Sequence, residues 1–269
     1  MSIVKALTIA GSDSGGGAGI QADIKTFQEL GVYGMSAVTA VTAQNTLGVQ
    51  GVYPLSKDAV TEQINSIAND LYPNAVKTGM LFNSEIIQAV SLKLKECKWE
   101  RVVVDPVMIA KGGSSLLQEE AIDTLKKYLI PLAYCITPNI PEAEAIVGYS
   151  IRSMEDRKQA AKAIIELGAK HVVVKGGHGD EEDAIDLLYD GNEYHYFAGK
   201  RTITMHTHGT GCTYAAAITA ELAKGRSACD AVRLAKAFIQ AAIEDNLGIG
   251  EGHGPTNHWA YQRREVYAR

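Results

Sequence analysis

Short runs rich in β-branched residues alternate with longer amphipathic stretches along this sequence. The runs at 6–11, 101–107 and 171–177 are typical of buried strands, whereas 20–30 repeats its apolar side chains at helical spacing. Such alternation is typical of right-handed strand–helix–strand crossovers. It predicts an α/β fold with a mostly parallel sheet covered by helices on both faces.

Further elements follow from the same periodicity. Additional strands are expected at 35–43, 75–80 and 134–139, and a hairpin at 184–190 and 193–199 with Gly191 and Asn192 between its strands. Additional helices are expected at 59–71, 84–97, 119–129, 140–148, 153–167, 210–224 and 228–247.

The composition is that of an ordinary folded protein. Hydrophobic residues make up 46% and charged residues 21% of the 269 residues, which argues against intrinsic disorder. A chain of this length can bury a sizeable core without disulfides or structural metals. Because no linker, repeat or low-complexity segment interrupts the pattern, we expect a single domain over residues 1–269.

Charge and cysteine usage restrict the partners and the location. The net charge of −5 argues against nucleic acid or an anionic membrane as the main partner, since both require clustered Lys and Arg. No apolar run approaches the roughly 18 residues of a membrane span, and the N-terminus lacks a secretory signal pattern. Cys97, Cys135, Cys212 and Cys229 match no zinc template, so a cytoplasmic protein with reduced thiols is expected.

The residues directly after the predicted strands are the candidates for chemistry, because parallel sheets bind ligands at the carboxyl ends of their strands. These residues are the segment 11–19, Gln44, Met80, Asp105, Asn139 and Lys175. We therefore expect one site at this edge of the sheet, built from segments that are distant in sequence.

The first glycine-rich segment, 11–23, follows a strand and opens a helix. It has no lysine in the GxxxxGK[ST] arrangement of a Walker loop, and Ile20 stands where GxGxxG requires glycine. Its glycines would let a ligand approach the backbone closely, and the alternative interpretation is a tight turn. A dinucleotide-dependent oxidoreductase, suggested only by the strand–helix alternation, is disfavoured by the missing fingerprint.

The second glycine-rich segment, 206–217, opens a long Ala-rich helix. Free amides and the positive end of the helix dipole at Gly209, Thr210 and Gly211 would form an anion site. The same field is expected to lower the pKa of Cys212, which could then take a proton from a hydroxyl group. The alternative is that Cys212 is a small buried apolar residue without a chemical role.

A polar set follows the later strands. Asp105, Asn139 and Glu142 could hold Mg²⁺, which prefers one or two carboxylates together with phosphate oxygens. Alternatively, Glu142 complements a helix dipole and Asp105 is a turn residue. Lys175 ends a Val-rich strand and precedes two glycines, a place suited to contact with a phosphate.

Four histidines near the C-terminal part invite a metal-site interpretation. Their spacing matches no common ligand motif, and glycines surround them, so loop histidines are the favoured interpretation. They are His206, His208, His253 and His258.

Motifs over nearly the whole chain together resemble the ribokinase-like superfamily, and more closely the bacterial hydroxymethylpyrimidine and phosphomethylpyrimidine kinases of thiamine biosynthesis. The motifs are LTIAGSDSGGGAGIQADIKTFQELGVYGMSAVTAVTAQNT, KTGML, DPVMIAKGG, TPNIPEAE, VVVKGGH, HTHGTGCT and GHGPTNH. The resemblance implies a three-layer α/β/α sandwich, usually assembled as a homodimer. It also implies that ATP and Mg²⁺ are used to phosphorylate a small molecule, 4-amino-5-hydroxymethyl-2-methylpyrimidine, and then its monophosphate.

The resemblance further implies roles for individual residues. Cys212 would be the base, and Gly209 and Gly211 would complete an anion hole. The residues implied to bind the pyrimidine are Gly11, Ala18, Asp23, Gln44, Met80 and Val107. Those implied to bind ATP are Lys175, Asn139 and Thr210, and those implied to hold Mg²⁺ are Asp105 and Glu142.

Two departures and two alternatives accompany this resemblance. Ribokinases proper usually have an aspartate where Cys212 stands, and many relatives have an aspartate in place of Ile203. The nearest alternative is a pyridoxal or pyridoxine kinase, although the Gln44 amide favours an aminopyrimidine because it can both donate and accept. A non-catalytic binding protein could dispense with Cys212, Lys175 and Glu142.

Overall fold

A single nine-stranded sheet forms the centre of the computed structural model, which describes residues 3–108, 120–178 and 183–267. Its strands are β1 (Lys5–Asp13), β2 (Tyr33–Asn45), β3 (Gly48–Pro54), β4 (Ala75–Thr78), β5 (Val102–Val104), β6 (Cys135–Ile136), β7 (Val172–Val174), β8 (Asp183–Tyr189) and β9 (Tyr194–Lys200). They lie in the order β3-β2-β1-β4-β5-β6-β7-β8-β9.

The inner part of the sheet is parallel and its two ends are antiparallel. Each neighbouring pair from β2 to β7 along the sheet order runs parallel. At one end β3 pairs antiparallel with β2, and at the other β8 pairs antiparallel with β7 and β9. The predicted mostly parallel sheet and the predicted hairpin are confirmed.

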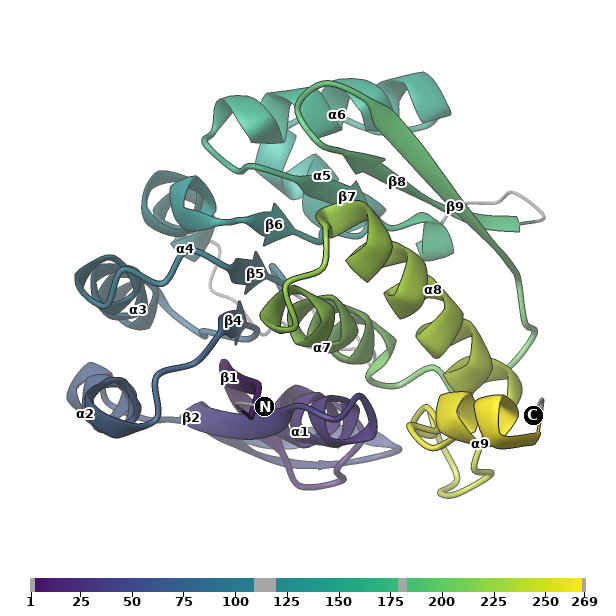
Figure 1. The fold of residues 1–269 in the computed structure, drawn as a ribbon, viewed down its shortest axis with the longest axis horizontal. Helices are drawn as coiled ribbons and strands as arrows, with labels where there is room; N and C mark the ends of the chain where they lie inside the picture. Colours follow the sequence, from purple (N-terminus) through teal and green to yellow (C-terminus); the bar gives the residue numbers. More distant parts are fainter. Residues whose placement is uncertain (1–2, 109–119, 179–182, 268–269) are drawn as a thin grey trace.

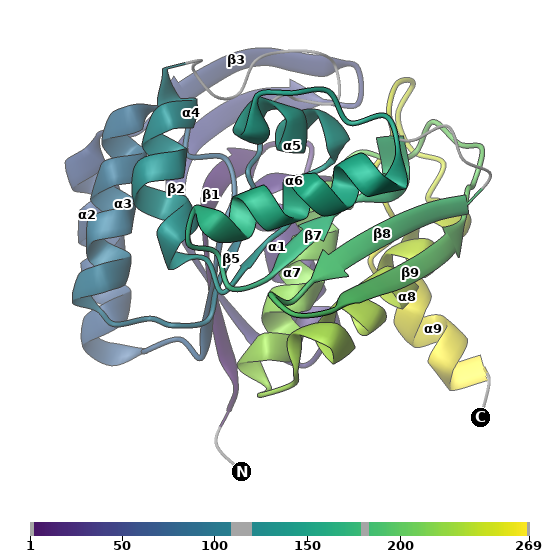
Figure 2. The same cartoon turned by 90° about the horizontal axis from the view of Figure 1, so that it is seen from above.

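Helices cover both faces of the sheet (Figures 1 and 2). One layer holds α2 (Lys57–Asp70), α3 (Ser84–Glu96), α4 (Ala121–Thr124), α5 (Ile140–Val147) and α6 (Met154–Glu166). The other holds α1 (Gly19–Glu29), α7 (Thr210–Ala223), α8 (Ala228–Glu244) and α9 (Ala260–Tyr267). This arrangement is the three-layer α/β/α sandwich. Among the helices of the described residues, none combines the length and hydropathy needed to cross a membrane.

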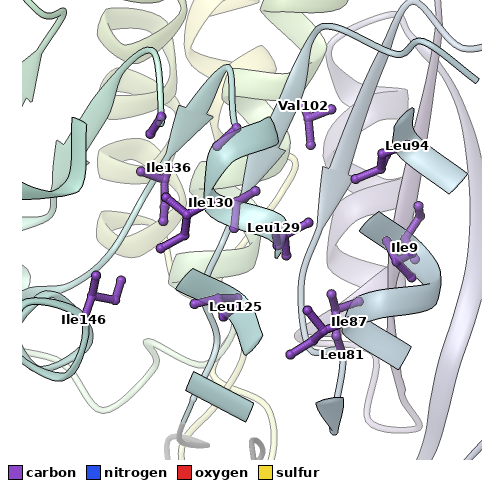
Figure 3. Packing of buried hydrophobic residues seen from close by; sticks show 14 of the residues in the cluster. Ile9, Leu81, Ile87, Leu94, Val102, Leu125, Leu129, Ile130, Ile136 and Ile146 are labelled. Atoms are coloured by element: carbon purple, nitrogen blue, oxygen red, sulfur yellow. The ribbon is translucent and has the colours of Figure 1, made fainter. Parts of the chain in front are cut away.

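A separate apolar core fills each side of the sheet. Figure 3 shows side chains of the core under α2 to α6, where Ile9, Val102 and Ile136 of the sheet pack with Ile87 and Leu129. The second core joins the sheet to α1, α7 and α8. Because α7 is rich in buried alanine, it packs closely on β1, β4 and β5 and brings its first turn to their carboxyl ends.

Three elements differ from the sequence-based expectations. The sequence does not predict strand β3, because it contains two glycines and a proline, which disfavour strands. Its antiparallel pairing with β2 stabilises the extended conformation despite this low intrinsic propensity. Helix α9 was not expected either. The helix predicted at 119–129 begins outside the described residues, and its visible part is α4 followed by a π-helical turn, Leu125–Leu129.

The two glycine-rich segments touch each other. Gly209 has a φ of +82°, and a Cβ there would collide with the carbonyl oxygen of Gly17. Gly19 has a φ of +56°, and a Cβ there would collide with the carbonyl oxygen of Gly11. Only glycine allows the backbone to come this close at both positions, so the start of α7 packs directly against the turn before α1.

We expect Gly209→Ala to lower the free energy of unfolding by about 3 kcal/mol, because it combines a left-handed backbone with a backbone collision. Gly225→Ala is the matched control, since Gly225 has a φ of +87° with open space around it. Its cost should be about 1 kcal/mol. Urea unfolding of both variants measures the difference, and equal losses would contradict the close approach.

Candidate active site

Charged side chains that directly follow β5 and β7 meet a charged side chain of α5 beside the first turn of α7. The ammonium group of Lys175 lies 3.1 Å from Oδ1 of Asp105 and 4.0 Å from Oε2 of Glu142. A Cβ built on Gly211 would lie 3.4 Å from the Lys175 nitrogen and 3.8 Å from Oδ2 of Asp105. The structure therefore brings Asp105, Glu142, Lys175 and Gly211 together at the predicted edge of the sheet.

A capping box places Glu142. The Asn139 side chain accepts a hydrogen bond of 2.8 Å from the Glu142 backbone, and the Glu142 carboxylate accepts one of 2.8 Å from the Asn139 backbone. Asn139 also forms a β-bridge with Lys175, whose amide donates to the carbonyl of Pro138 at 2.9 Å. The start of α5 and the end of β7 are thus held in one register.

Burial governs the charges in this group. It raises the pKa of Glu142 to about 7, and the neighbouring Asp105 adds to the rise while Lys175 opposes it. Burial works to lower the pKa of Lys175, but the carboxylates of Asp105 and Glu142 outweigh it and hold that pKa above its usual range. Oδ2 of Asp105 is buried and has no hydrogen-bond partner within the protein. This oxygen is available to a bound cation.

Cys212 lies in the first turn of α7, but its pKa moves in the direction opposite to the expectation. Burial raises the pKa of the thiol to about 11, and the Asp23 and Asp105 carboxylates raise it further. Lys77 and the backbone amide of Gly19 act to lower it. The expected lowering, which considered only the helix N-terminus, is wrong because it ignored desolvation and the two nearby carboxylates.

A buried ion pair lies next to Cys212. Lys77 of β4 contacts the two carboxylate oxygens of Asp23 at 2.7 and 2.8 Å, and the Thr8 hydroxyl donates to the same carboxylate at 2.6 Å. Lys77 and Asp23 are both completely buried. Despite burial, the Asp23 charge holds the pKa of Lys77 above its usual range. Asp23, which the resemblance assigned to the pyrimidine, therefore has its carboxylate engaged within the protein.

The turn before α1 is organised around Asp13. Its carboxylate accepts hydrogen bonds from the amides of Gly15 at 2.8 Å, Gly17 at 3.1 Å and Ala18 at 2.8 Å. Nε2 of His208 approaches the same carboxylate at 2.8 Å. Although burial opposes it, these bonds, above all the one from His208, lower the pKa of Asp13. Amides that could have faced a ligand here bind the protein's own carboxylate.

The remaining residues assigned to the pyrimidine lie on both sides of this turn. A Cβ on Gly11 would collide with the Met80 side chain, so these two residues are in direct contact. Gln44 is half-buried, and its side-chain amide contacts Thr42 at 3.1 Å and His208 at 3.4 Å. Ala18 and Val107 are half-buried and lie close in sequence to Asp13 and Asp105, respectively. Thr210 turns its hydroxyl to the Thr207 carbonyl at 2.7 Å.

The comparison with known proteins decides the family. A family model described as phosphomethylpyrimidine kinase matches residues 13–257. The chain belongs to the phosphomethylpyrimidine kinase family. A hydroxymethylpyrimidine/phosphomethylpyrimidine kinase from Bacillus subtilis is 59% identical over 267 residues, which cover 99% of this chain and 98% of the relative. The family predicted from the motifs is confirmed.

Solved structures of related kinases confirm the predicted ribokinase-like fold. The ADP complex of a pyridoxal kinase from Bacillus subtilis matches with a TM-score of 0.91 and 44% identity, over 97% of this chain and 99% of that one. The Staphylococcus aureus pyridoxal kinase in complex with AMP-PCP and pyridoxal matches with a TM-score of 0.91 and 40% identity, over 98% and 96% of the two chains.

Several polar residues of this family member were not identified from its sequence. The sequence patterns assign no role to Asp13, Lys77 or Thr8. For Asp13 a signal exists, since an aspartate followed by Ser and three glycines is typical of a turn. Of the four histidines, His208 contacts Asp13, and burial lowers the pKa of His258 to about 4. His258 lies in a turn, as predicted for a loop histidine, but it is buried, and its Nε2 lies 3.0 Å from the Thr213 hydroxyl.

The raised pKa of Glu142 makes stability depend on pH. Because the pKa lies above the ordinary 4.5 in the folded protein, ionisation opposes folding as pH rises through about 7. Glu142→Gln keeps the capping box and removes this penalty. We expect the variant to gain about 1–3 kcal/mol relative to wild type between about pH 5 and about pH 8, measured by urea unfolding.

Glu85→Gln is the matched control, because Glu85 is an exposed glutamate in the first turn of α3. The gain expected for Glu142→Gln between about pH 5 and about pH 8 should be absent from this control. A Glu142→Gln variant whose stability relative to wild type is the same at both pH values would contradict the raised pKa.

Proposed function

We propose that this protein phosphorylates hydroxymethylpyrimidine with ATP, and then phosphorylates the monophosphate to the diphosphate, in thiamine biosynthesis. One observation carries the proposal: Lys175, Asp105 and Glu142 converge on the first turn of α7, next to Cys212. Phosphoryl transfer depends mainly on positioning and on neutralising charge, and this arrangement supplies both. The name and the high identity of the Bacillus subtilis relative support the pyrimidine as substrate.

The phosphates of ATP would be bound between Lys175 and the start of α7. Helix geometry leaves the amides of Gly211 and Cys212 without carbonyl partners inside the helix. Together with the Lys175 ammonium group, these amides stabilise negative charge as it spreads over the transferred phosphoryl group. Asn139 and Thr210 are proposed as further ATP contacts. The ADP and AMP-PCP complexes of the two solved kinases support a nucleotide in this fold.

The residues present also fit Mg²⁺. The unpartnered Oδ2 of Asp105 and the carboxylate of Glu142 are oxygen ligands of the kind that Mg²⁺ prefers. Within the described residues, no group of three or more His, Cys, Asp or Glu is placed to hold a metal ion, so phosphate oxygens and water would complete the coordination. When bound, the ion would neutralise charge on the ATP phosphates.

Cys212 is proposed as the base. In the first reaction its thiolate takes the proton from the substrate hydroxyl, the hydroxyl oxygen bonds to the γ-phosphorus, and the bond from that phosphorus to ADP breaks. In the second reaction the phosphate oxygen of the monophosphate is the nucleophile. Because burial raises the thiol pKa to about 11, only a small fraction is thiolate at neutral pH. The rate should therefore depend on pH.

If Cys212 is the base, Cys212→Ala lowers kcat by about 10²–10⁴ while the fold is kept. The kcat of the wild type rises almost tenfold per pH unit from about pH 6 to about pH 9, because the thiolate fraction rises in that proportion. Cys212→Asp, whose carboxyl titrates much lower, should show a flatter profile. The rate of ADP release with hydroxymethylpyrimidine as substrate is measured for the wild type, Cys212→Ala and Cys212→Asp. Two ADP are expected for each pyrimidine that is converted to the diphosphate.

A well-folded Cys212→Ala variant with near wild-type turnover would reject Cys212 as the base. An equal pH dependence of wild type and Cys212→Ala would do the same. If the wild type releases ADP with pyridoxal but not with hydroxymethylpyrimidine, the second candidate function, a pyridoxal kinase, is correct.

Pyridoxal remains the second candidate because the two pyridoxal kinases described above share the fold of this chain. We propose that the pyrimidine is distinguished by Gln44, within a site completed by Gly11, Ala18, Met80 and Val107. Its amide can donate to a ring nitrogen and accept from the exocyclic amino group of an aminopyrimidine. Pyridoxal carries a phenolic oxygen in place of that amino group.

Gln44→Met is expected to weaken hydroxymethylpyrimidine binding by about 1–3 kcal/mol, because the hydrogen bonds are lost and the amine is left unpaired. The loss for pyridoxal should be much smaller. The measurement is the ratio of kcat/KM for the two substrates, which should fall in the variant. Equal losses would show that Gln44 shapes the site without recognising the ring.

The homodimer implied by the resemblance stays a prediction. The exposed apolar side chains of Val41, Leu47 and Tyr53 along β2, β3 and their connection support a self-association surface at that edge of the sheet. Sedimentation of the purified protein would report twice the 28.8 kDa of one chain if it is correct.

A further inference from the structure

The side-chain amide of Gln44 lies between two polar groups that together decide its orientation. Oε1 of the amide lies 3.1 Å from Oγ1 of Thr42, and Nε2 of the amide lies 3.4 Å from Nε2 of His208. The nitrogen and oxygen ends of an amide have nearly the same shape, so the donors and acceptors around them determine which end is which. The hydrogens and lone pairs that Thr42 and His208 have available therefore determine the orientation of the amide.

The proton of His208 is fixed by Asp13. Nε2 of His208 lies 2.8 Å from the Asp13 carboxylate, whose pKa is lowered so that it is ionised at neutral pH. A carboxylate only accepts hydrogen bonds, so Nε2 must carry the hydrogen and donate it. Nε2 then has no lone pair for an amide N–H of Gln44. These contacts favour the reverse assignment of the two amide ends, with the Gln44 carbonyl oxygen facing His208, because it avoids placing an N–H group of Gln44 against the N–H of Nε2.

The hydroxyl of Thr42, at the other end of the amide, favours the same orientation of Gln44. Its oxygen lies 2.9 Å from the carbonyl oxygen of Ser12, which can only accept, so the single hydroxyl hydrogen is directed there. The lone pairs of the Thr42 oxygen remain for an N–H group. In this orientation the end of Gln44 that faces Thr42 is its NH₂ group, and all donors in this chain of contacts have acceptors.

We propose that His208 and Thr42 are positioning residues that fix the orientation of the Gln44 amide and thereby set the preference for an aminopyrimidine. The inference rests on the proposed function, in which Gln44 recognises the ring. In this orientation the Gln44 oxygen is free to accept from the exocyclic amine, and the N–H that is not directed to Thr42 donates to the ring nitrogen. The opposite orientation of the amide would set donor against donor and acceptor against acceptor.

His208 can be substituted without removing the backbone hydrogen bonds of Asp13 that hold the turn before α1. Asp13 keeps the amides of Gly15, Gly17 and Ala18 as partners when the imidazole is replaced. His208 precedes Gly209, however, so a change there could also disturb the start of α7. Thr42 lies on the other side of Gln44, in β2, and tests the same idea independently of α7.

The experiment compares His208→Phe, Thr42→Val and His208→Gln with wild type. Phenylalanine and valine keep the bulk and remove the polar groups, whereas glutamine restores an N–H near the position of Nε2. His195→Phe is the matched control, because His195 lies 3.1 Å from Asp190 beside the β8–β9 hairpin connection, in an equivalent pair remote from Gln44. The readouts are the dissociation constant of hydroxymethylpyrimidine by calorimetry, and KM and kcat for hydroxymethylpyrimidine, pyridoxal and ATP.

We expect His208→Phe and Thr42→Val each to raise the dissociation constant and KM of hydroxymethylpyrimidine roughly five- to thirtyfold, as the loss of one or two hydrogen bonds would. The KM of ATP should stay within about twofold, and pyridoxal should be affected less than the pyrimidine. His208→Gln should recover most of the affinity, and His195→Phe should match wild type.

Unchanged pyrimidine affinity in Thr42→Val, or equal losses for the pyrimidine, pyridoxal and ATP in both variants, would overturn the inference and leave the proposed function intact. Failure of the wild type to bind hydroxymethylpyrimidine would overturn both. The two failures are distinguishable because the second is seen in the wild type alone.

Discussion

The buried ion pair between Lys77 and Asp23 is the interaction around which the site is built. Both side chains are removed from water, and an unpaired charge in such a place would cost several kcal/mol. The pair joins β4 to α1 across β1, and Thr8 of β1 donates to the same carboxylate. Its lysine also acts on the Cys212 thiol, so the pair links the packing of the core to the chemistry at α7.

Charges of alternating sign extend outward from this pair. Asp105 lies close enough to raise the pKa of Lys77, and Lys175 lies between Asp105 and Glu142. Each lysine therefore has a carboxylate neighbour, and each carboxylate is held near a cation or backbone amides. A nucleotide phosphate would compete with these carboxylates for Lys175, and Oδ2 of Asp105 has no hydrogen-bond partner within the protein. Glycines at 209 and 211 allow α7 to approach closely enough to contribute its amides.

Much of this organisation could be predicted from the sequence because it is local. Hydrophobic periodicity located most strands and helices, and the rule for parallel sheets placed Asp105, Asn139 and Lys175 at one edge. Features that depend on tertiary burial were not predictable in this way. The helix start suggested a low pKa for Cys212, whereas desolvation and two carboxylates from other segments reverse it. Likewise, Asp13 pairs with His208, almost two hundred residues away, and no local pattern indicates that contact.

On the proposed function, this charged edge of the sheet transfers phosphate from ATP to an aminopyrimidine rather than to pyridoxal. A competition assay tests it most directly, with ATP, Mg²⁺ and equal concentrations of hydroxymethylpyrimidine and pyridoxal in one reaction, followed by mass spectrometry of the products. We expect the pyrimidine monophosphate to form first and to be converted to the diphosphate, faster than any pyridoxal phosphate accumulates. Pyridoxal phosphate as the main product, or a pyrimidine left unphosphorylated while ATP is consumed, would contradict the proposed function.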